Sequence, residues 1–360
     1  MRILQVMAGG EHGGAEMAFV DMCIAMKQAG VEVQVVTRAN KTRIPLLQAA
    51  GLKVDTLPFG GPIDKITPFL MTRIIKKFEP DIVQTWMSRG AQKVLHWTKT
   101  KTDKPYINVA RLGGYYPLKH FKNSDFFITI TPDIGRHLKE SGVDEARVRF
   151  IQNFAETEND ATPVSRGDLK TPKDALVLLT LARLHESKAI DVVLKALQDL
   201  PNAYLWVAGE GPLRGELEDL AKNLSVYDRV RFLGWRTDRS ALLQAADICL
   251  FTSRYEPFGT VFAQSWASKT PVIVTKTNGP SQFCEDGVDS IMIEIDDKNA
   301  MVAAIHKIAN DKVLQMNLVN NGYKKYLDQF TKEKSVGAYL DYYQQILYQQ
   351  NLSNSVSAAS

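Results

Sequence analysis

Three charged residues in the second half of the chain have the types and spacing to handle a diphosphate and a sugar. Arg183 and Lys188 stand five residues apart in one polar segment. A guanidinium binds phosphate oxygens as a fork and an ammonium acts as a point charge, so the two could clamp one diphosphate. Glu256 stands before a Pro-Phe-Gly turn that opens a predicted helix. Its carboxylate could accept sugar hydroxyls while the amides of residues 259–261 bind charged oxygens.

Two glycine-rich segments could bring the backbone close to the same kind of ligand. Residues 9–14 read Gly-Gly-Glu-His-Gly-Gly between the first predicted strand and helix, and residues 209–212 read Gly-Glu-Gly-Pro after a later strand. Glycine permits close approach to a phosphate or sugar, and a helix N-terminus offers unpaired N–H groups. The first segment is not GxGxxG, and the second predicted strand ends at Thr37-Arg38 without the acidic residue that binds the ribose of NAD. The pattern argues against a dehydrogenase.

Each of these features also has a purely structural explanation. The glycines could form only a tight turn, Arg183 and Lys188 could be a solvated pair, and Glu256 could cap the helix that follows. When each segment is considered alone, these structural explanations remain open.

Short β-branched runs alternate with helical patterns twice along the chain, and these elements must position the charged residues. Strands are predicted at 3–8, 31–37, 53–58, 81–85, 106–110, 126–130 and 148–151, and again at 176–181, 203–208, 230–233, 248–251, 272–274 and 291–295. A polar stretch with two prolines, residues 153–174, separates the halves. The pattern predicts an α/β protein with two doubly wound, Rossmann-like parallel-sheet domains, residues 1–165 and 172–334. Its ligands are expected in the cleft between the domains.

Basic residues are concentrated in one part of the first half. The whole chain has a net charge of +4, whereas residues 65–122 hold twelve Lys and Arg against three Asp and Glu. Within them, residues 67–78 predict an amphipathic helix carrying Arg73, Lys76 and Lys77. Such a region attracts phosphates, anionic sugars, anionic lipids or nucleic acid, unless it is only a solvated face. No helix-turn-helix, zinc-finger or RNP signature favours nucleic acid.

Composition excludes several other classes of protein. The 360 residues are 45% apolar, which is enough for globular cores and rules out disordered or fibrous chains. No run of 18 apolar residues is present, so no segment is expected to span a bilayer, and the N-terminus reads as a strand and not as a signal peptide. Three widely spaced cysteines exclude a disulfide scaffold or cysteine-rich zinc site and suit the cytoplasm.

Taken together, the segments resemble the GT-B glycosyltransferases, specifically the retaining family 4. The resemblance extends over nearly the whole chain and is carried by residues 9–14, Arg183 with Lys188, and residues 209–212, 230–234, 256–259 and 278–280. It implies a nucleotide-sugar donor bound mostly by the second domain and an acceptor bound mostly by the first. It also implies that no metal or other cofactor is required, and that a final helix at 335–350 packs back on the first domain.

The resemblance assigns roles to particular residues. The implied catalytic residues are Glu256, Arg183 and Lys188. The implied donor-binding residues are Gly13, Gly14, Gly209, Gly211, Pro212, Trp235, Phe258, Gly259, Thr260, Val261 and Gln264. The implied acceptor-binding residues are Arg111, Lys119 and His120.

Three positions depart from the family pattern. Gln264 stands where the family has a second Glu that binds ribose hydroxyls, and Ala189 stands where a Gly usually follows the lysine. Arg111 occupies a position at which many members have a His facing the donor sugar. Residues 111–120 instead resemble a subset that builds lipopolysaccharide or lipooligosaccharide core sugars.

The expected function is the transfer of a hexose, with retention, from a nucleotide sugar to a lipid-linked anionic saccharide in core synthesis. The expected location is the cytoplasm, with peripheral contact at the inner-membrane surface and no nucleic acid as partner. A GT-B sugar-nucleotide epimerase, which needs no acceptor, is the alternative enzyme. A catalytically inactive glycan-binding relative is the non-enzymatic alternative, prompted by Gln264 and Arg111.

Overall fold

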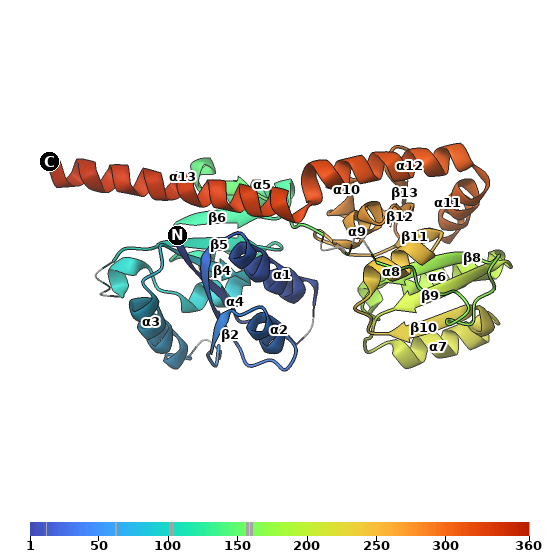
Figure 1. The fold of residues 1–360 in the computed structure, drawn as a ribbon, viewed down its shortest axis with the longest axis horizontal. Coiled ribbons are helices and arrows are strands. Elements are labelled where there is room, and N and C mark those ends of the chain that lie inside the picture. The colour runs from blue at the N-terminus through green and yellow to red at the C-terminus, as the bar shows by residue number, and fades with distance from the viewer. Residues whose placement is uncertain are drawn as a thin grey trace. The chain divides into compact units, whose positions relative to one another are not determined.

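A computed structural model describes residues 1–11, 13–61, 63–100, 102, 104–155, 158 and 161–359, with side chains up to residue 350 in the last helix. The chain divides into two compact units. Unit 1 consists of Met1–Asn153 and the C-terminal segment from Lys332, and unit 2 consists of Phe154–Thr331. Each unit contains one sheet with its own helices (Figure 1).

Unit 1 is built on a seven-stranded parallel sheet with the order β3-β2-β1-β4-β5-β6-β7. Its strands are β1 (Arg2–Met7), β2 (Glu32–Thr37), β3 (Lys53–Thr56), β4 (Ile82–Trp86), β5 (Ile107–Leu112), β6 (Phe126–Thr129) and β7 (Val148–Phe150). Its helices are α1 (Gly14–Gln28), α2 (Arg43–Ala49), α3 (Ile66–Phe78), α4 (Met87–Lys93), α5 (Pro132–Glu140) and α13 (Lys332–Ala359), with short turns η1 (Trp97–Lys99), η2 (Leu118–Phe121) and η3 (Glu145–Arg147). The strand order reverses between β1 and β4, which is where such sheets bind ligands.

Unit 2 is built on a six-stranded parallel sheet with the order β10-β9-β8-β11-β12-β13. Its strands are β8 (Leu176–Leu181), β9 (Ala203–Ala208), β10 (Val230–Gly234), β11 (Ile248–Phe251), β12 (Val272–Thr275) and β13 (Ile291–Ile293). Its helices are α6 (Ile190–Ala196), α7 (Arg214–Asn223), α8 (Arg239–Ala245), α9 (Val261–Ala267), α10 (Pro280–Phe283), α11 (Lys298–Asn310) and α12 (Lys312–Lys325). Short turns are η4 (Glu186–Lys188), η5 (Leu197–Asp199) and η6 (Tyr227–Arg229), and a π-helical turn, η7 (Tyr326–Phe330), follows α12. Here the order reverses between β8 and β11.

The central strands are near-continuous apolar runs because helices cover both faces of a parallel sheet. In β1 every residue from Ile3 to Met7 is buried, and all four residues of β11 are buried. The doubly wound α/β fold predicted from the alternation of strands and helices is confirmed in both units.

The boundary between the units differs from the predicted one. The sequence placed the end of the first domain at residue 165, whereas the chain enters unit 2 at Phe154. The N–H of Ala155 donates to the Phe330 carbonyl at 3.1 Å, and the N–H of Val164 donates to the Ala241 carbonyl at 3.2 Å. These bonds attach the described part of the polar stretch to unit 2.

The last helix, α13, belongs to unit 1, where the sequence predicted that residues 335–350 would pack. Tyr339, Tyr343 and Ile346 are buried on one of its faces. The Tyr343 hydroxyl donates to the Gln84 side-chain oxygen on β4, which ties the helix to the middle of the sheet. In the described part of the chain, no helix is both long enough and apolar enough to cross a bilayer.

Candidate active site

The loops at the carboxyl ends of three adjacent strands, β9, β8 and β11, meet in unit 2. We call residues 183–188, after β8, the clamp loop and residues 253–259, after β11, the glutamate loop. The clamp loop bonds to the loop after β9 through the N–H of Leu184 and the Glu210 carbonyl, 3.0 Å apart. It bonds to the glutamate loop through the N–H of Arg254 and the Ser187 carbonyl, 2.8 Å apart. Because β8 and β11 flank the reversal of strand order, these loops lie where a doubly wound sheet binds its ligand.

Two of the predicted catalytic side chains are in direct contact. The Lys188 ammonium lies 2.5 Å from Oε2 of Glu256, and the two side chains are only 22% and 13% exposed. An ammonium has three N–H donors, so this bond uses one of those on Lys188. The Arg183 side chain is exposed and makes no hydrogen bond or ion pair with the described residues. The clamp loop thus holds one cation against the carboxylate and presents another to solvent.

The glycines of these loops are required by close packing. At Gly211 a Cβ would run into the backbone of Leu184, whose nitrogen would be 2.7 Å away. Gly259 has a φ of +72°, and a Cβ there would collide with the Phe251 ring. Because backbone and buried rings cannot move aside cheaply, other residues would push these loops apart.

The remaining predicted donor-binding residues of unit 2 lie on the segments that follow β9, β10 and β11. Phe258 is buried, and Thr260 precedes α9, which begins at Val261. Gln264 lies on α9, is 4% exposed, and makes no side-chain hydrogen bond with the described part of the chain. On the β9 side, Gly209 donates its N–H to the Gly234 carbonyl at 2.7 Å, next to the exposed Trp235, and Pro212 is also exposed.

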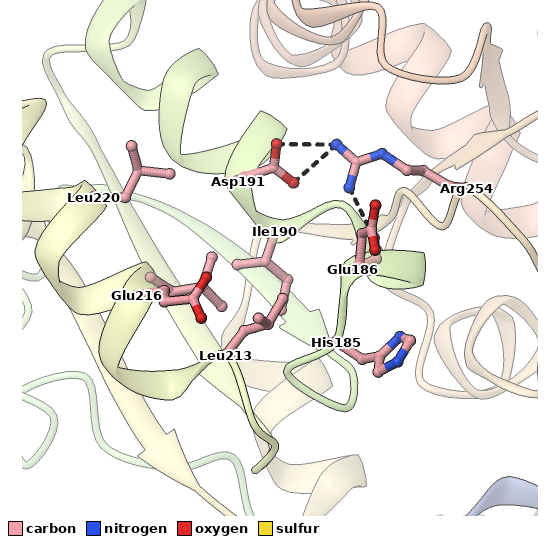
Figure 2. A pocket seen from close by; sticks show the side chains of 9 residues that line it. His185, Glu186, Ile190, Asp191, Leu213, Glu216, Leu220 and Arg254 are labelled. Carbon is pink, nitrogen blue, oxygen red and sulfur yellow. Dashed lines mark hydrogen bonds and ion pairs between the residues drawn. The ribbon is translucent and has the colours of Figure 1, made fainter.

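A pocket of about 470 Å³ lies beside the clamp loop. Figure 2 shows its lining, which includes His185 and Glu186 of the clamp loop, the start of α6, and Leu213 before α7. None of the three predicted catalytic residues lines it. The pocket is therefore adjacent to the predicted donor site and distinct from the Lys188–Glu256 contact. Across the described residues, no group of three or more His, Cys, Asp or Glu side chains is arranged to hold a metal ion.

In unit 1 the buried side chain of Arg43 supports the described part of the glycine-rich segment at residues 9–14. Arg43 donates to the Thr37 hydroxyl at 3.0 Å and to the Gly10 carbonyl at 3.2 Å. Glu16 accepts the N–H of Gly10 at 2.6 Å. Gly13 precedes α1 and Gly14 is its first residue, with open space where a Cβ would be. His12 of this predicted loop lies outside the described residues.

Arg111, predicted to contact the acceptor, is 1% exposed. Its guanidinium stacks 4.1 Å from the Trp86 ring and donates to Asn153, while Nε and Nη1 have no partner among the described residues. Burial lowers the pKa of Arg111, and the neighbouring Tyr339 hydroxyl of α13 opposes that shift. A buried guanidinium cannot touch a saccharide in solvent. Its burial argues against the direct acceptor contact, and we assign Arg111 to the packing under α13.

The other two predicted acceptor-binding residues lie on η2, after β5. Lys119 is exposed, and the His120 ring nitrogen Nδ1 lies 2.7 Å from the Gln92 amide nitrogen on α4. Both side chains belong to unit 1, and each remains at or near the surface.

Two arginines that organise the loops, Arg43 and Arg254, were not singled out from the sequence. Arg254 stands two residues before Glu256, so its place inside the strongest motif was the available signal. Arg43 had no comparable signal, because its partners Thr37 and Gly10 lie on other segments.

Two family models match successive parts of the chain. The model described as "Glycosyltransferase Family 4" matches residues 12–159, and the model described as "Glycosyl transferases group 1" matches residues 162–325. The first match lies mostly in unit 1 and the second lies in unit 2.

Curated relatives and solved structures agree with these matches. Lipopolysaccharide core biosynthesis glycosyltransferase LpsE of Rhizobium meliloti (strain 1021) is 32% identical over 334 residues, 92% of this chain and 96% of that protein. LpsD of the same organism is 30% identical over 343 residues, 95% and 97% of the two chains. The crystal structure of Anabaena Alr3699/HepE in complex with UDP has a TM-score of 0.81 at 17% identity, with 96% and 100% coverage. That of WaaG, a glycosyltransferase involved in lipopolysaccharide biosynthesis, has a TM-score of 0.71 at 16% identity, with 94% and 98% coverage. The chain has the GT-B fold of these structures and belongs to glycosyltransferase family 4, as its motifs predicted.

Proposed function

We propose that this glycosyltransferase moves a hexose, with retention of configuration, from a nucleotide sugar to a lipid-linked anionic saccharide during lipopolysaccharide or lipooligosaccharide core synthesis. The observation that carries the proposal is the Lys188–Glu256 contact at the ligand-binding edge of the unit 2 sheet, with Arg183 exposed on the same loop. The names of LpsE and LpsD support core synthesis, and the HepE structure with UDP and glucose supports a nucleotide sugar as donor.

In the proposed reaction the protein positions the reactants and stabilises charge. The bond between the sugar C1 and the diphosphate oxygen breaks, and the acceptor oxygen attacks C1 from the same face. Because the attack is on the same face, no side chain has to act as nucleophile. The acceptor proton passes to the leaving phosphate oxygen, so no side chain has to act as general base. Arg183 and Lys188 neutralise the departing diphosphate, and Glu256 holds donor-sugar hydroxyls while positive charge develops on the ring.

In the same scheme, cationic side chains stabilise the leaving diphosphate, a role that a metal ion has in other enzymes. Cationic side chains or Mg²⁺ can stabilise a leaving phosphate, and here a guanidinium and an ammonium share one loop. We therefore propose that the enzyme needs no metal or other cofactor. Activity that is unchanged after chelation with EDTA would support this, and activity restored only by a divalent cation would contradict it.

We also propose peripheral association with the cytoplasmic face of the inner membrane through α3. The α3 surface, as we define it, consists of Ile66, Phe69, Arg73, Lys76 and Lys77, all of them exposed. Ile66 and Phe69 are 62% and 63% exposed, while the opposite face of α3 packs in the core of unit 1. Large apolar side chains beside three cations suit an anionic lipid surface, where each basic residue contributes about 1 kcal/mol.

Vesicle sedimentation tests the membrane contact directly. Replacing Arg73, Lys76 and Lys77 with Gln should weaken binding to anionic vesicles, and the difference from the parent protein should shrink at high salt. Lys307 on α11 with Lys312 and Lys324 on α12, all of them exposed, offer a control set with equal charge. If the α3 variant and the parent bind vesicles equally at every salt concentration, the α3 surface is only a solvated face.

The activity itself is tested in two stages. A thermal-shift panel of nucleotide sugars identifies the donor, because a ligand that binds only the native state raises the melting temperature. Release of the nucleoside diphosphate is then measured with and without a core-truncated, phosphorylated lipooligosaccharide, and the anomeric configuration of the product is read by NMR. Release that requires the acceptor, with the donor configuration kept, is the expected result. Acceptor-independent conversion of the donor would instead indicate an epimerase, and binding without turnover an inactive glycan-binding protein.

A further inference from the structure

Arg254 connects the two loops that carry the proposed catalytic residues. Its Nη1 donates to the Glu186 carbonyl in the clamp loop at 2.7 Å, and its Nη2 donates to Asp191 at the start of α6 at 2.9 Å. Its Nε donates to Asp296, beyond β13, at 2.7 Å. Figure 2 shows the guanidinium directed toward Asp191, with a further dashed line to Glu186. One side chain thus attaches the glutamate loop to three other segments.

Because of these contacts, the Arg254 guanidinium is not available to bind a diphosphate. Asp191 and Asp296 both pair with it, so the guanidinium is neutralised within the protein. Hydrogen bonding to Asp191, with a further contribution from Asp296, raises the pKa of Arg254, which keeps it cationic. The Arg183 guanidinium differs, because that side chain is exposed and has no partner among the described residues. The role of Arg254 must therefore be exerted through the segments that it joins.

A strained residue directly follows the clamp loop and needs such support. Ala189, directly after Lys188, has a φ of +51°, in the left-handed region that favours glycine. A residue with a Cβ stays in this conformation only where its surroundings hold it. Arg254 holds both sides of this position, through the Glu186 and Ser187 carbonyls before it and through Asp191 after it.

We propose that Arg254 is a positioning residue that keeps the clamp loop and the strained Ala189 after it in place, and thereby holds the Lys188 ammonium against Glu256. This inference rests on the proposed function for its effect on turnover. The proposed effect on the position of Lys188 does not depend on that function, because Arg254 holds Lys188 whether or not a donor is bound.

Replacing Arg254 tests the proposal against a matched control. Arg254→Met should lower kcat by about 10- to 100-fold, the loss typical of reacting groups displaced by about 1 Å. The Kd for UDP should change less than kcat does. Arg254→Lys can reach one of the partners but cannot bridge them all, so its kcat should be intermediate. Arg166→Met is the control, because Arg166 also joins backbone carbonyls to a carboxylate, Asp247, at similar exposure, away from the clamp loop.

A second substitution separates positioning from general stabilisation. Ala189→Gly removes the backbone strain, so the Arg254→Met loss should be at least about threefold smaller in the Ala189→Gly background than in the parent. If the two losses are equal, or if Arg254→Met has the same kcat as Arg166→Met, the positioning role is overturned. Should Arg254→Met fail to fold, the same comparison is made with Arg254→Lys.

Hydrogen exchange distinguishes failure of this inference from failure of the proposed function. If the parent enzyme turns over no nucleotide sugar, the proposed function fails, but the amides of residues 186–190 still report on the loop. Faster exchange at these amides in Arg254→Met than in Arg166→Met supports the positioning role without any activity. Equal exchange in the two variants contradicts it.

Discussion

The Lys188 ammonium lies 2.5 Å from the Glu256 carboxylate, although the two residues are 68 positions apart in the chain. The contact forms because β8 and β11 are neighbours in the sheet and both loops leave it at the same edge. It places a cation suited to the leaving diphosphate beside a carboxylate suited to sugar hydroxyls. The pair therefore marks where the bond between the sugar and the diphosphate would break in the proposed reaction.

The two cations of the clamp loop should respond differently to removal. Arg183→Ala and Lys188→Ala should each weaken binding of the nucleoside diphosphate and lower turnover by about 10- to 100-fold, the equivalent of about 1.5–3 kcal/mol for one charge-assisted contact. Only Lys188→Ala should also lower the melting temperature, because it leaves the mostly buried Glu256 carboxylate without its partner. Turnover and calorimetry on both variants check this. Unchanged activity in both would show that the loop is not a phosphate clamp.

Gly211 should tolerate no side chain. Gly211→Ala would press a Cβ against the backbone of Leu184 in the clamp loop, so we expect a loss of stability of about 1–3 kcal/mol and a fall in turnover. Gly215→Ala is the matched control, since a Cβ at this α7 position meets nothing within 4 Å and alanine favours a helix. Urea unfolding of both variants measures the difference. Equal stability of the two would mean that the loops can separate freely.

Asp64 should make the stability of unit 1 depend on pH. It accepts the N–H groups of Ile66 and Thr67 at the start of α3, both at 3.0 Å, and that of Gly60 at 2.8 Å. Hydrogen bonding to Thr67, through its side chain and its backbone N–H, holds the pKa of Asp64 well below its usual range. The pKa of Asp64 is thus lower in the folded protein than the value of about 3.9 expected in the unfolded chain. The ionised carboxylate therefore stabilises the fold. This contribution is complete at pH values above the unfolded pKa and is lost as the pH falls toward the folded pKa.

The corresponding measurement compares the parent with Asp64→Asn. The parent should have the larger free energy of unfolding at pH 7, and the difference between the two proteins should shrink as the pH is lowered below about 4. A difference that stays constant from pH 7 to about pH 3 would show that the Asp64 charge does not contribute.

The regular part of the fold could be predicted from the sequence because it depends on local patterns. Apolar runs such as β1 and β11 are buried on both faces, and their strand-to-helix turns contain the glycines and charged residues that the motifs indicated. Parallel strands bring these turns to one edge, and the resemblance to the family then assigned Arg183, Lys188 and Glu256 to one catalytic set.

What could not be predicted depends on partners far away in the chain. Arg111 was predicted to bind the acceptor, but Trp86 and α13 bury it, and neither contact leaves a periodic signal around residue 111. Arg254 was not singled out, because its carboxylate partners Asp191 and Asp296 come from two other segments. The left-handed conformation of Ala189 was not predicted, because alanine itself does not indicate it; the only signal was the Gly that the family usually has at this position.

The most direct test of the central claim is the turnover of Glu256→Gln with the donor identified by thermal shift. The substitution keeps the size of the side chain and a hydrogen-bonding oxygen but removes the charge that faces Lys188. If this charge stabilises the transition state, turnover should fall on the order of 100-fold or more, while the Kd for the nucleoside diphosphate changes much less and the protein stays folded. Near-normal turnover in a folded Glu256→Gln protein would contradict the account and leave Glu256 as a structural partner of Lys188.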